Sequence, residues 1–362
     1  MSWLLLVLLF PYFFLLLRIY RGLLTIKQFR SEKHCTAFLS VIIPCRNEEK
    51  DLPSLLADIS RQTISNSLFE LIVVDDNSTD STFQTASRFT GISRARVISN
   101  TGKGKKSAIR TGVEASAGEL IITIDADCRI SNTFLETISS FYSESGPAMI
   151  ICPVKPERGK GFFERFQELE FLSLQGVTAG SAMLGSPVMC NGAGLAFTRE
   201  AFLDNSDGLH YELASGDDIF LLQSLKKQSG KSIKWIESVA ATVTTKLSVS
   251  PASLLRQRAR WISKTGHYSD TSAIVLAIVT FVTILAQIAI LTAGIFSPSI
   301  LMIFAVYVLI KSVPDFLILR NTASRYGRRS LLIWFLPSQL IYPFYVFAVV
   351  VYSLFMKLTT HF

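Results

Sequence analysis

Long apolar runs stand at both ends of the chain, and a region of shorter apolar runs lies between them. Residues 1–17 are almost entirely apolar, and residues 273–296, 300–319 and 331–356 form three further runs. An apolar run of about 20 residues is long enough to cross a bilayer as a helix. We therefore expect a membrane anchor at residues 1–22, a polar domain at residues 38–265 and three membrane spans within residues 273–357.

Basic residues beside these runs indicate which side of the membrane each loop occupies. They follow the first run and separate the third from the fourth: Arg18, Arg21, Lys27, Arg30, Lys33, Arg320, Arg325, Arg328 and Arg329. Cytoplasmic loops carry an excess of Lys and Arg. A cleaved signal peptide has its basic residues before the apolar run, so the first run reads as an uncleaved anchor. We predict a multi-pass cell-membrane protein with its N-terminus outside and residues 30–270 in the cytoplasm.

The middle of the chain alternates short apolar runs, typical of buried strands, with helical segments. Strands are expected at residues 38–43 and 71–74, a third short strand ends at residues 97–98, and a fourth ends at Asp125. Helices are expected at residues 53–62, 105–115 and 132–142. A further helix is expected after Ser78 or Thr79, either of which can cap it, and Ser131 can cap the helix at 132–142. This alternation predicts an α/β fold built on a parallel, doubly wound sheet.

Polar residues follow three of these strands. They are Arg46, Glu48, Asp75, Asp76, Asp125 and Asp127. Ligands of doubly wound sheets bind beyond the carboxyl ends of the strands. Asp125 and Asp127 come directly after a buried strand, and two carboxylates in this arrangement suit Mg²⁺ or Mn²⁺ holding a diphosphate. Asp-x-Asp alone is also common at the start of an ordinary solvated loop.

A basic, glycine-rich turn at residues 102–107 resembles a phosphate-binding loop. It does not match G-x-x-x-x-G-K-[ST], because Lys105 stands where the second glycine belongs. A basic turn that opens a helix can still bind phosphate. Lys105 is therefore a candidate for a diphosphate contact, and a solvated charge cluster is an equally good interpretation.

Net charge and the positions of cysteine and histidine indicate which kinds of binding partner to expect. A net charge of +8 could indicate nucleic acid. Much of that charge lies beside the apolar runs, where anionic lipid headgroups explain it better, so we expect a bilayer and no nucleic acid as partner. The five cysteines form no C-x-x-C pair and the four histidines are scattered. We expect free thiols and no zinc site.

Two later segments carry further candidates. Asp217 and Asp218 precede an apolar helical run, where an acid is often only a helix cap. Residues 251–264 form a basic helix immediately before the second apolar run, and Gln257, Arg260 and Trp261 lie on it. The plainer interpretation is a helix that lies on the membrane surface.

Taken in order, these elements resemble the membrane-bound family 2 glycosyltransferases that carry a Q-x-x-R-W motif. The likeness covers residues 38 to 265 and rests on Val-Ile-Ile-Pro at 41–44 with Asn-Glu at 47–48, and on Val-Asp-Asp-Asn-Ser-Thr-Asp at 74–80. It continues through Gly-Lys at 104–105, Asp-Ala-Asp at 125–127, Asp-Asp at 217–218 and Gln-Arg-Ala-Arg-Trp at 257–261. The order of apolar runs is similar to that of ceramide glucosyltransferases and bacterial glycolipid or carotenoid glycosyltransferases.

The resemblance implies a GT-A fold and a metal-dependent, inverting transfer from a nucleotide sugar, usually a UDP-sugar. It implies nucleotide-sugar contacts at Pro44, Arg46, Glu48, Asp75, Asp76, Lys105, Asp125, Gln257, Arg260 and Trp261, and Mg²⁺ or Mn²⁺ at Asp125 and Asp127. Asp218 would be the general base, with Asp217 as the alternative, because Gly216 and Asp217 depart from the family's usual residues before that position.

Three functions remain open on the sequence. The first is transfer of one sugar to a membrane acceptor, most simply a lipid. The second is processive polysaccharide synthesis, as in cellulose and hyaluronan synthases, although four spans are few for a sugar-conducting channel. The third is a non-catalytic subunit that binds a sugar nucleotide, which would need no general base. The donor sugar, the acceptor and the oligomeric state are not determined by the sequence.

Overall fold

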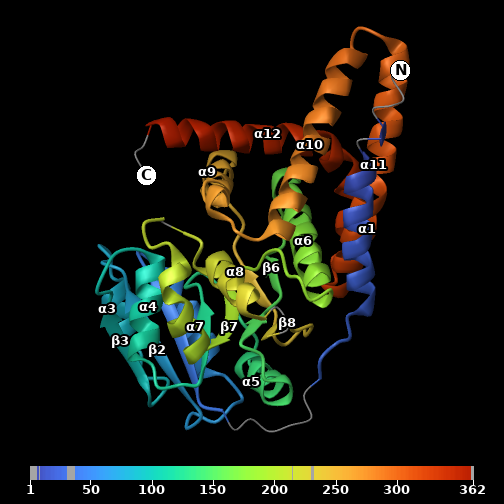
Figure 1. Ribbon diagram of the computed structural model, residues 1–362. Coiled ribbons are helices and arrows are strands. Elements are labelled where there is room, and N and C mark those ends of the chain that lie inside the picture. Colours follow the sequence, from blue (N-terminus) through green and yellow to red (C-terminus); the bar gives the residue numbers. More distant parts are fainter. Residues whose placement is uncertain (1–5, 8, 31–36, 214, 230–231, 360–362) are drawn as a thin grey trace. The chain divides into compact units, whose positions relative to one another are not determined.

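The computed structural model describes residues 6–7, 9–30, 37–213, 215–229 and 232–359 (Figure 1). The chain divides into two compact units. The first, which we call the sheet unit, comprises Ile26–Glu157 and Gly185–Lys246. The second, which we call the helical unit, comprises the chain up to Thr25, Arg158–Leu184 and the chain from Leu247 onward.

A seven-stranded sheet forms the core of the sheet unit. Its strands are β1 (Leu39–Cys45), β2 (Phe69–Asp75), β3 (Ala95–Ser99), β4 (Leu120–Ile124), β5 (Met149–Ile151), β7 (Gly194–Thr198) and β8 (Ile233–Trp235), in the order β3-β2-β1-β4-β7-β5-β8. All residues of β1, β2 and β4 are buried. Continuous apolar runs fit strands that are covered on both faces. The four strands expected from the sequence are confirmed and mutually parallel.

One further strand, β7, which the sequence did not predict, departs from the parallel arrangement. β7 runs antiparallel to both β4 and β5, so the sheet is mixed. Before β7, the chain leaves the sheet unit through residues 158–184 and returns at Gly185. No crossover helix packed on the sheet therefore imposes a parallel direction on β7. A separate two-stranded sheet pairs β6 (Val154–Pro156) with β9 (Val243–Thr245).

The helices of the sheet unit follow the expected alternation, with shifted starts. They are α2 (Leu52–Ser60), α3 (Thr82–Ser87), α4 (Lys105–Ala115), α5 (Phe134–Ser145), α7 (Arg199–Asn205) and α8 (Asp217–Ser229), with a short helix at Ser206–Leu209. The expected caps were wrong, since Ser81 and Thr133 occupy the N-cap positions of α3 and α5. Ser78 is engaged elsewhere, because its Oγ accepts a hydrogen bond from the Asn47 N–H.

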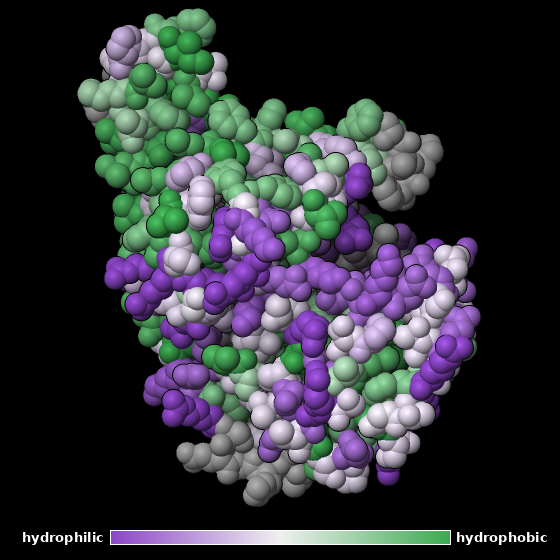
Figure 2. Space-filling view, turned by 180° about the vertical axis from the view of Figure 1, so that it is seen from behind, coloured by the Kyte–Doolittle hydropathy of each residue, from purple (hydrophilic) through white to green (hydrophobic). Residues whose placement is uncertain are grey.

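The helical unit holds the long apolar helices. It contains α1 (Leu9–Thr25), α6 (Phe162–Met183), α9 (Pro251–Ile262), α10 (Thr271–Gly294), α11 (Pro298–Arg325) and α12 (Phe335–Thr359), with short helices at Thr265–His267 and Arg329–Trp334. Three segments are long and apolar enough to cross a membrane: Thr271–Gly294, Pro298–Arg325 and Arg329–Leu358. Figure 2 shows apolar side chains over the projecting hairpin of α10 and α11. The anchor expected within residues 1–22 is not confirmed as a span, and residues 1–5 and 8 lie outside the described residues.

Close helix packing and buried polar contacts hold the helical unit together. A Cβ added at Gly22 of α1 would lie 2.2 Å from the carbonyl oxygen of Gly180 in α6, so α1 and α6 touch through their backbones. The Tyr307 hydroxyl of α11 donates to the Thr283 carbonyl of α10 at 2.9 Å. Two opposite charges four residues apart on α11 form an ion pair, with Lys311 Nζ 2.8 Å from Asp315 Oδ2.

Candidate active site at the carboxyl ends of the strands

The loop after β1 is tied to the loop after β2. Pro44 lies in β1 beyond the last residue paired with β4, so its missing N–H removes no hydrogen bond on that side. Asn47 adopts a left-handed conformation (φ 58°), and its Oδ1 accepts a hydrogen bond from the Thr79 N–H at 2.8 Å. Asn tolerates this conformation better than most residues. The two loops therefore present Arg46, Glu48 and the Asp75–Asp76 pair from one edge of the sheet.

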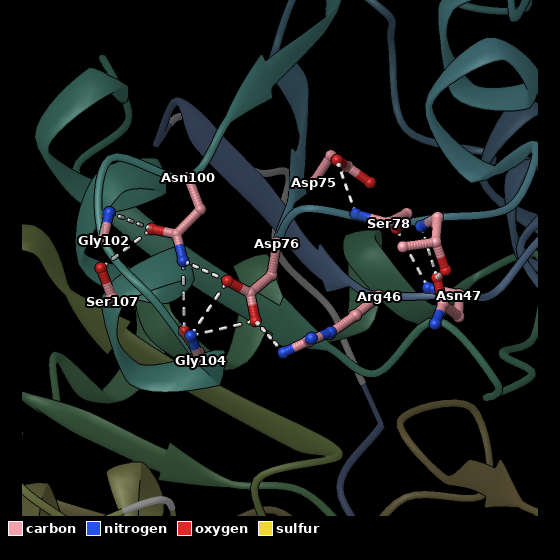
Figure 3. Close-up of polar contacts among 10 residues, drawn as sticks. Arg46, Asn47, Asp75, Asp76, Ser78, Asn100, Gly102, Gly104 and Ser107 are labelled. Atoms are coloured by element: carbon pink, nitrogen blue, oxygen red, sulfur yellow. Dashed lines mark hydrogen bonds and ion pairs between the residues drawn. The ribbon is translucent and has the colours of Figure 1, made fainter.

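Asp76 holds the loop that precedes α4 (Figure 3). Its carboxylate accepts hydrogen bonds from Asn100 Nδ2 at 2.6 Å and from the Gly104 N–H at 2.9 Å. Arg46 Nη1 lies 3.8 Å from Asp76 Oδ2, and the Arg46 side chain is 61% exposed. Asn100 Oδ1 in turn accepts from Ser107 Oγ. Asp76 is thus a residue that shapes the basic turn at 102–107, a role that the sequence pattern did not predict.

Asp75 differs from its neighbour Asp76. Its Oδ2 accepts a hydrogen bond from the Ser78 N–H at 3.2 Å. Its Oδ1 is buried and has no hydrogen-bond partner among the residues that the structure describes. A buried carboxylate oxygen without a partner is costly unless a ligand supplies a donor. Asp75 Oδ1 is therefore the atom in this loop that is suited to accept a hydrogen bond from a bound ligand.

Lys105 joins the carboxylates at the carboxyl end of β4 to those of α8. Its Nζ lies 2.5 Å from Asp125 Oδ1 and 3.9 Å from Asp217 Oδ2. Burial disfavours the charged ammonium, but Asp125 and Asp217 outweigh that effect and raise the pKa of Lys105. The next residue, Lys106, points elsewhere. Its Nζ donates hydrogen bonds to the backbone carbonyls of Leu209 and His210.

The acids of this edge lie close enough to influence one another. Burial, followed by repulsion from Asp127, Asp51 and Asp125, raises the pKa of Glu48 to about 7. Burial also raises the pKa of Asp125, and the Lys105 ammonium opposes that shift. A local excess of carboxylates is expected where a cation or a cationic group binds.

The two acids that begin α8 face this cluster. Asp218 Oδ2 accepts a hydrogen bond from the Gly192 N–H at 3.0 Å, and its Oδ1 accepts from the Ile219 N–H at 2.7 Å. A Cβ added at Gly192 would lie 3.2 Å from Asp217 Oδ2 and 3.3 Å from Lys105 Nζ. Gly192 therefore stands where α8 and Lys105 meet, and the glycine-rich run at 192–194 was its signal in the sequence.

An ion pair missed by the sequence reasoning anchors the Asp-x-Asp loop. Arg129 follows that loop, and its Nε and Nη2 donate to the two carboxylate oxygens of Asp58 in α2, at 2.6 Å and 2.8 Å. The Ile130 N–H also donates to Asp58 Oδ2. Bidentate pairing of this kind fixes orientation as well as position. Nothing in the spacing of the two residues along the chain indicated it.

The carboxylates at this edge can be compared with the ligands of the divalent ion that the resemblance implies. Asp125 and Asp127 supply oxygen ligands, which Mg²⁺ and Mn²⁺ prefer. Among the described residues, no group of three or more His, Cys, Asp or Glu side chains is arranged to hold a metal ion. Mg²⁺ typically uses one or two carboxylates and completes its shell with water and substrate phosphates. The residues therefore fit an ion that is bound jointly with a diphosphate.

The remaining candidates lie on α9 in the helical unit. Arg260 is exposed, whereas Gln257 and Trp261 are half-buried. Between them, Arg258 is buried and forms an ion pair with Glu170 of α6, with 2.6 Å between Nη2 and Oε2. Arg258 Nη1 donates to Gln257 Oε1 at 2.5 Å, and its guanidinium carbon lies 4.1 Å from the centre of the Trp261 ring. Arg258 thus orders two residues of the Q-x-x-R-W motif, a role that the motif pattern did not assign.

Comparison with known proteins agrees with this geometry. Residues 40–206 match the family model for glycosyl transferase family 2. The chain is similar to mannosyltransferase PcManGT from Pyrobaculum calidifontis, solved with GDP-Man and Mn²⁺, with a TM-score of 0.62 and 17% identity over 99% of this chain and 100% of that one. Residues 40–206 therefore form a glycosyltransferase family 2 domain, and its sheet is of the GT-A type, as the resemblance in the sequence indicated.

Curated relatives share part of their length with this chain. Glycosyltransferase AglE of Haloferax volcanii is 33% identical over 31% of this chain and 38% of its own length. A 4,4'-diaponeurosporenoate glycosyltransferase of Staphylococcus haemolyticus is 38% identical over 32% of this chain and 31% of its own length. An undecaprenyl-phosphate 4-deoxy-4-formamido-L-arabinose transferase of Pseudomonas paraeruginosa is 41% identical over 25% and 27%. The match thus spans well under half of each of these relatives.

Proposed function

We propose that the protein is a metal-dependent, inverting glycosyltransferase that moves a sugar from a nucleotide sugar, most simply a UDP-sugar, to a membrane lipid. The observation that carries this proposal is the cluster formed by Lys105, Asp125 and Asp217 at the carboxyl ends of the strands. A cation held between carboxylates from two elements suits a substrate that brings negative phosphate charge. The names of the relatives, which include transferases acting on a carotenoid acid and on undecaprenyl phosphate, support a lipid acceptor.

The loop after β2 supplies the nucleotide end of the proposed site. Asp75 Oδ1 is the buried acceptor without a partner, and the N3–H of uracil is a donor of matching chemistry. Asp76 maintains the turn at 102–107 and thereby the start of α4, where Lys105 lies. Arg46, whose side chain is largely exposed beside Asp76, is free to move onto a bound phosphate.

The carboxyl end of β4 supplies the diphosphate end. Asp125 and Asp127 would hold Mg²⁺ or Mn²⁺ together with the diphosphate; the bound ion would neutralise charge that develops on the leaving group. Lys105 would contribute a second positive charge that stabilises that leaving group. For Lys105 to exchange a carboxylate partner for a phosphate oxygen, only the end of its own flexible side chain has to move.

Asp218 is the proposed general base. Inverting displacement at an anomeric carbon needs a group that takes the proton of the acceptor hydroxyl on the face opposite the leaving group. Both carboxylate oxygens of Asp218 accept hydrogen bonds from backbone N–H groups, and these bonds fix the orientation of the carboxylate. Asp217, whose Oδ2 faces Lys105, is the alternative base.

The experiment is a transfer assay on the full chain in lipid bilayers, with Mg²⁺ or Mn²⁺ and a panel of radiolabelled UDP- and GDP-sugars. We expect label in one discrete band that organic solvent extracts, and loss of that label in EDTA or in Asp127→Ala. A ladder or an insoluble product would indicate processive synthesis instead. Nucleotide binding without transfer from any donor would indicate a non-catalytic binding subunit.

A further inference from the structure

We propose that α12 lies along the surface of one leaflet and binds lipid through one face, instead of crossing the bilayer. Within the helical unit, α12 runs across the direction of α10 and α11 (Figure 1). A third span of a bundle would run alongside the other two.

The two faces of α12 differ in what covers them. One face packs on protein and includes Ser338, Val349 and Ser353. The opposite face is an unbroken apolar stripe of exposed side chains at three- and four-residue intervals: Leu336, Leu340, Phe344, Phe347, Val351, Leu354 and Leu358. An exposed apolar surface of this extent marks a contact with lipid or with another protein. A helix with one such stripe is suited to lie in an interface with the stripe buried among acyl chains.

Polar contacts fix the level at which α12 leaves α11. Gln339 Oε1 accepts from Lys311 Nζ at 2.9 Å, and Gln339 Nε2 donates to Asp315 Oδ2 at 3.0 Å. Large exposed apolar side chains on α11 end at Val313, and the exposed Arg320 follows two turns later. The start of α12 therefore lies near the level where the lipid-facing surface of α11 gives way to charge.

The far half of α12 decides between a span and a surface helix. Ser353 Oγ donates to the carbonyl of Ala259 in α9. Ser353 is 14 residues beyond Gln339, about 21 Å along a helix. If α12 crossed the bilayer, its contact with α9 would lie about 21 Å deep in the hydrocarbon. The exposed Arg256 and Arg260 of α9 would then also lie in the hydrocarbon. Each arginine near the bilayer centre costs about 3 kcal/mol or more.

A helix parallel to the membrane plane avoids that cost. The stripe then enters the acyl chains, and α9 lies beneath α12 at the level of the headgroups, where its arginines meet phosphates. Lys357 is exposed near the end of α12 and would also lie at headgroup level. These charges favour lipid as the occupant. The charged residues beside the apolar stripe are cations, which suit anionic headgroups, whereas the rim of a protein interface is usually a mixture of polar groups.

Spin labels test the depth of the helix. Cysteines would replace Leu340 and Phe347 in a background with Cys35→Ser and Cys190→Ser, since the other three cysteines are buried. Nitroxides on them would be measured in vesicles containing anionic lipid by collision with oxygen and with a water-soluble nickel complex. We expect equal depths, within about 5 Å. In a span, seven residues would separate the two labels by about 10 Å along the normal.

A matched pair on α10 calibrates the experiment. Ile278 and Leu285 are also exposed, apolar and seven residues apart. Labels there should differ in depth by about 10 Å, because α10 is a span in either arrangement. A depth difference on α12 equal to that on α10 would overturn the proposal. So would labels on α12 that are shielded from both quenchers, since another protein would then cover the stripe.

Sidedness gives a second readout. Lys357→Cys should react with a membrane-impermeant maleimide from the side that labels Lys103→Cys of the sheet unit. Ser299→Cys, in the first turn of α11, should react from the opposite side. Labelling of Lys357→Cys from the Ser299 side would show that α12 crosses the bilayer and would overturn the proposal.

Discussion

Lys105 Nζ lies 2.5 Å from Asp125 Oδ1, and this contact connects the start of α4 to the carboxyl end of β4. A second carboxylate, Asp217 in the first turn of α8, is 3.9 Å from the same nitrogen. Three elements that are far apart in the sequence therefore share one positive charge. Binding of a diphosphate at this point would exchange one set of anionic oxygens for another, so the charge of Lys105 remains compensated throughout.

The first prediction concerns that lysine. Lys105→Ala should lower kcat/KM by about 10²- to 10³-fold, because a positive charge that stabilises the leaving diphosphate is removed. Lys103→Ala is the matched control; its side chain is exposed, and kcat/KM should stay within about twofold. Lys106→Ala should instead lower the melting temperature, because the carbonyls of Leu209 and His210 lose their donor. Unchanged donor affinity in Lys105→Ala would remove Lys105 from the diphosphate site.

The second prediction separates the two acids of α8. Asp218→Asn should lower the transfer rate by about 10²- to 10⁴-fold, the usual contribution of a general base, while UDP affinity changes little. Asp217→Asn should reduce transfer less and should act mainly through donor affinity, because Asp217 faces Lys105. Transfer assays paired with calorimetric UDP binding measure both quantities. The reverse ranking would assign the base to Asp217.

The third prediction concerns Gly192. A methyl group there would lie 3.2 Å from Asp217 Oδ2 and 3.3 Å from Lys105 Nζ, and both atoms are the ends of flexible side chains. Gly192→Ala should therefore fold with a melting temperature near that of the wild type, but kcat should fall about tenfold as the charged groups are displaced. Gly266→Ala is the control, since nothing lies within 4 Å of its added Cβ. Normal kcat in Gly192→Ala would show that this contact has no part in transfer.

The fourth prediction uses the titration of Glu48. Burial and neighbouring carboxylates raise its pKa to about 7 in the folded protein, from an ordinary value of 4.5. The folded state therefore favours the protonated carboxyl, and this contribution to stability is fully present below pH 4.5 and is lost as the pH rises to about 7. Glu48→Gln resembles the protonated form at every pH. Its melting temperature relative to wild type should rise between pH 4.5 and 7.5, and a constant difference would contradict the assigned shift.

The sequence predicted the elements that local pattern determines. Buried strands at β1, β2 and β4 and the whole of α4 followed from apolar runs and from the basic turn before the helix. The edge of the sheet where Glu48, Asp75 and Asp125 gather followed from the rule for parallel strands. The order of the family 2 motifs along the chain then indicated the family, which a single carboxylate could not do.

What depends on long-range packing was not predictable in the same way. The antiparallel direction of β7 follows from the path of the chain through another unit, which no local pattern records. The pairing of Arg129 with Asp58 joins residues 71 positions apart. Apolar composition likewise cannot distinguish a span from a surface helix, because residues 329–358 are long and apolar enough to cross a membrane whichever way α12 lies. Direction and contacts make that distinction.

The final prediction concerns the anchor of the Q-x-x-R-W helix. Arg258 of α9 is bound by Glu170 of α6, and the Tyr345 hydroxyl of α12 donates to Glu170 Oε1 at 2.9 Å. Glu170→Gln would leave the buried Arg258 without a counter-charge and should cost about 3 kcal/mol of stability. Tyr345→Phe removes one hydrogen bond and should cost about 1 kcal/mol.

The milder variant tests whether this anchor positions the motif. In Tyr345→Phe, Gln257 and Trp261 keep their contacts with Arg258, but the ion pair that holds Arg258 loses one support. We expect kcat to fall several-fold at unchanged KM for the donor, because orientation during the reaction is affected more than donor binding. Tyr352→Phe changes a hydroxyl two turns further along the same helix and should leave kcat unchanged. Equal effects of the two substitutions on kcat would mean that α12 contributes only general packing, and that Arg258 is held in place by Glu170 without help from Tyr345.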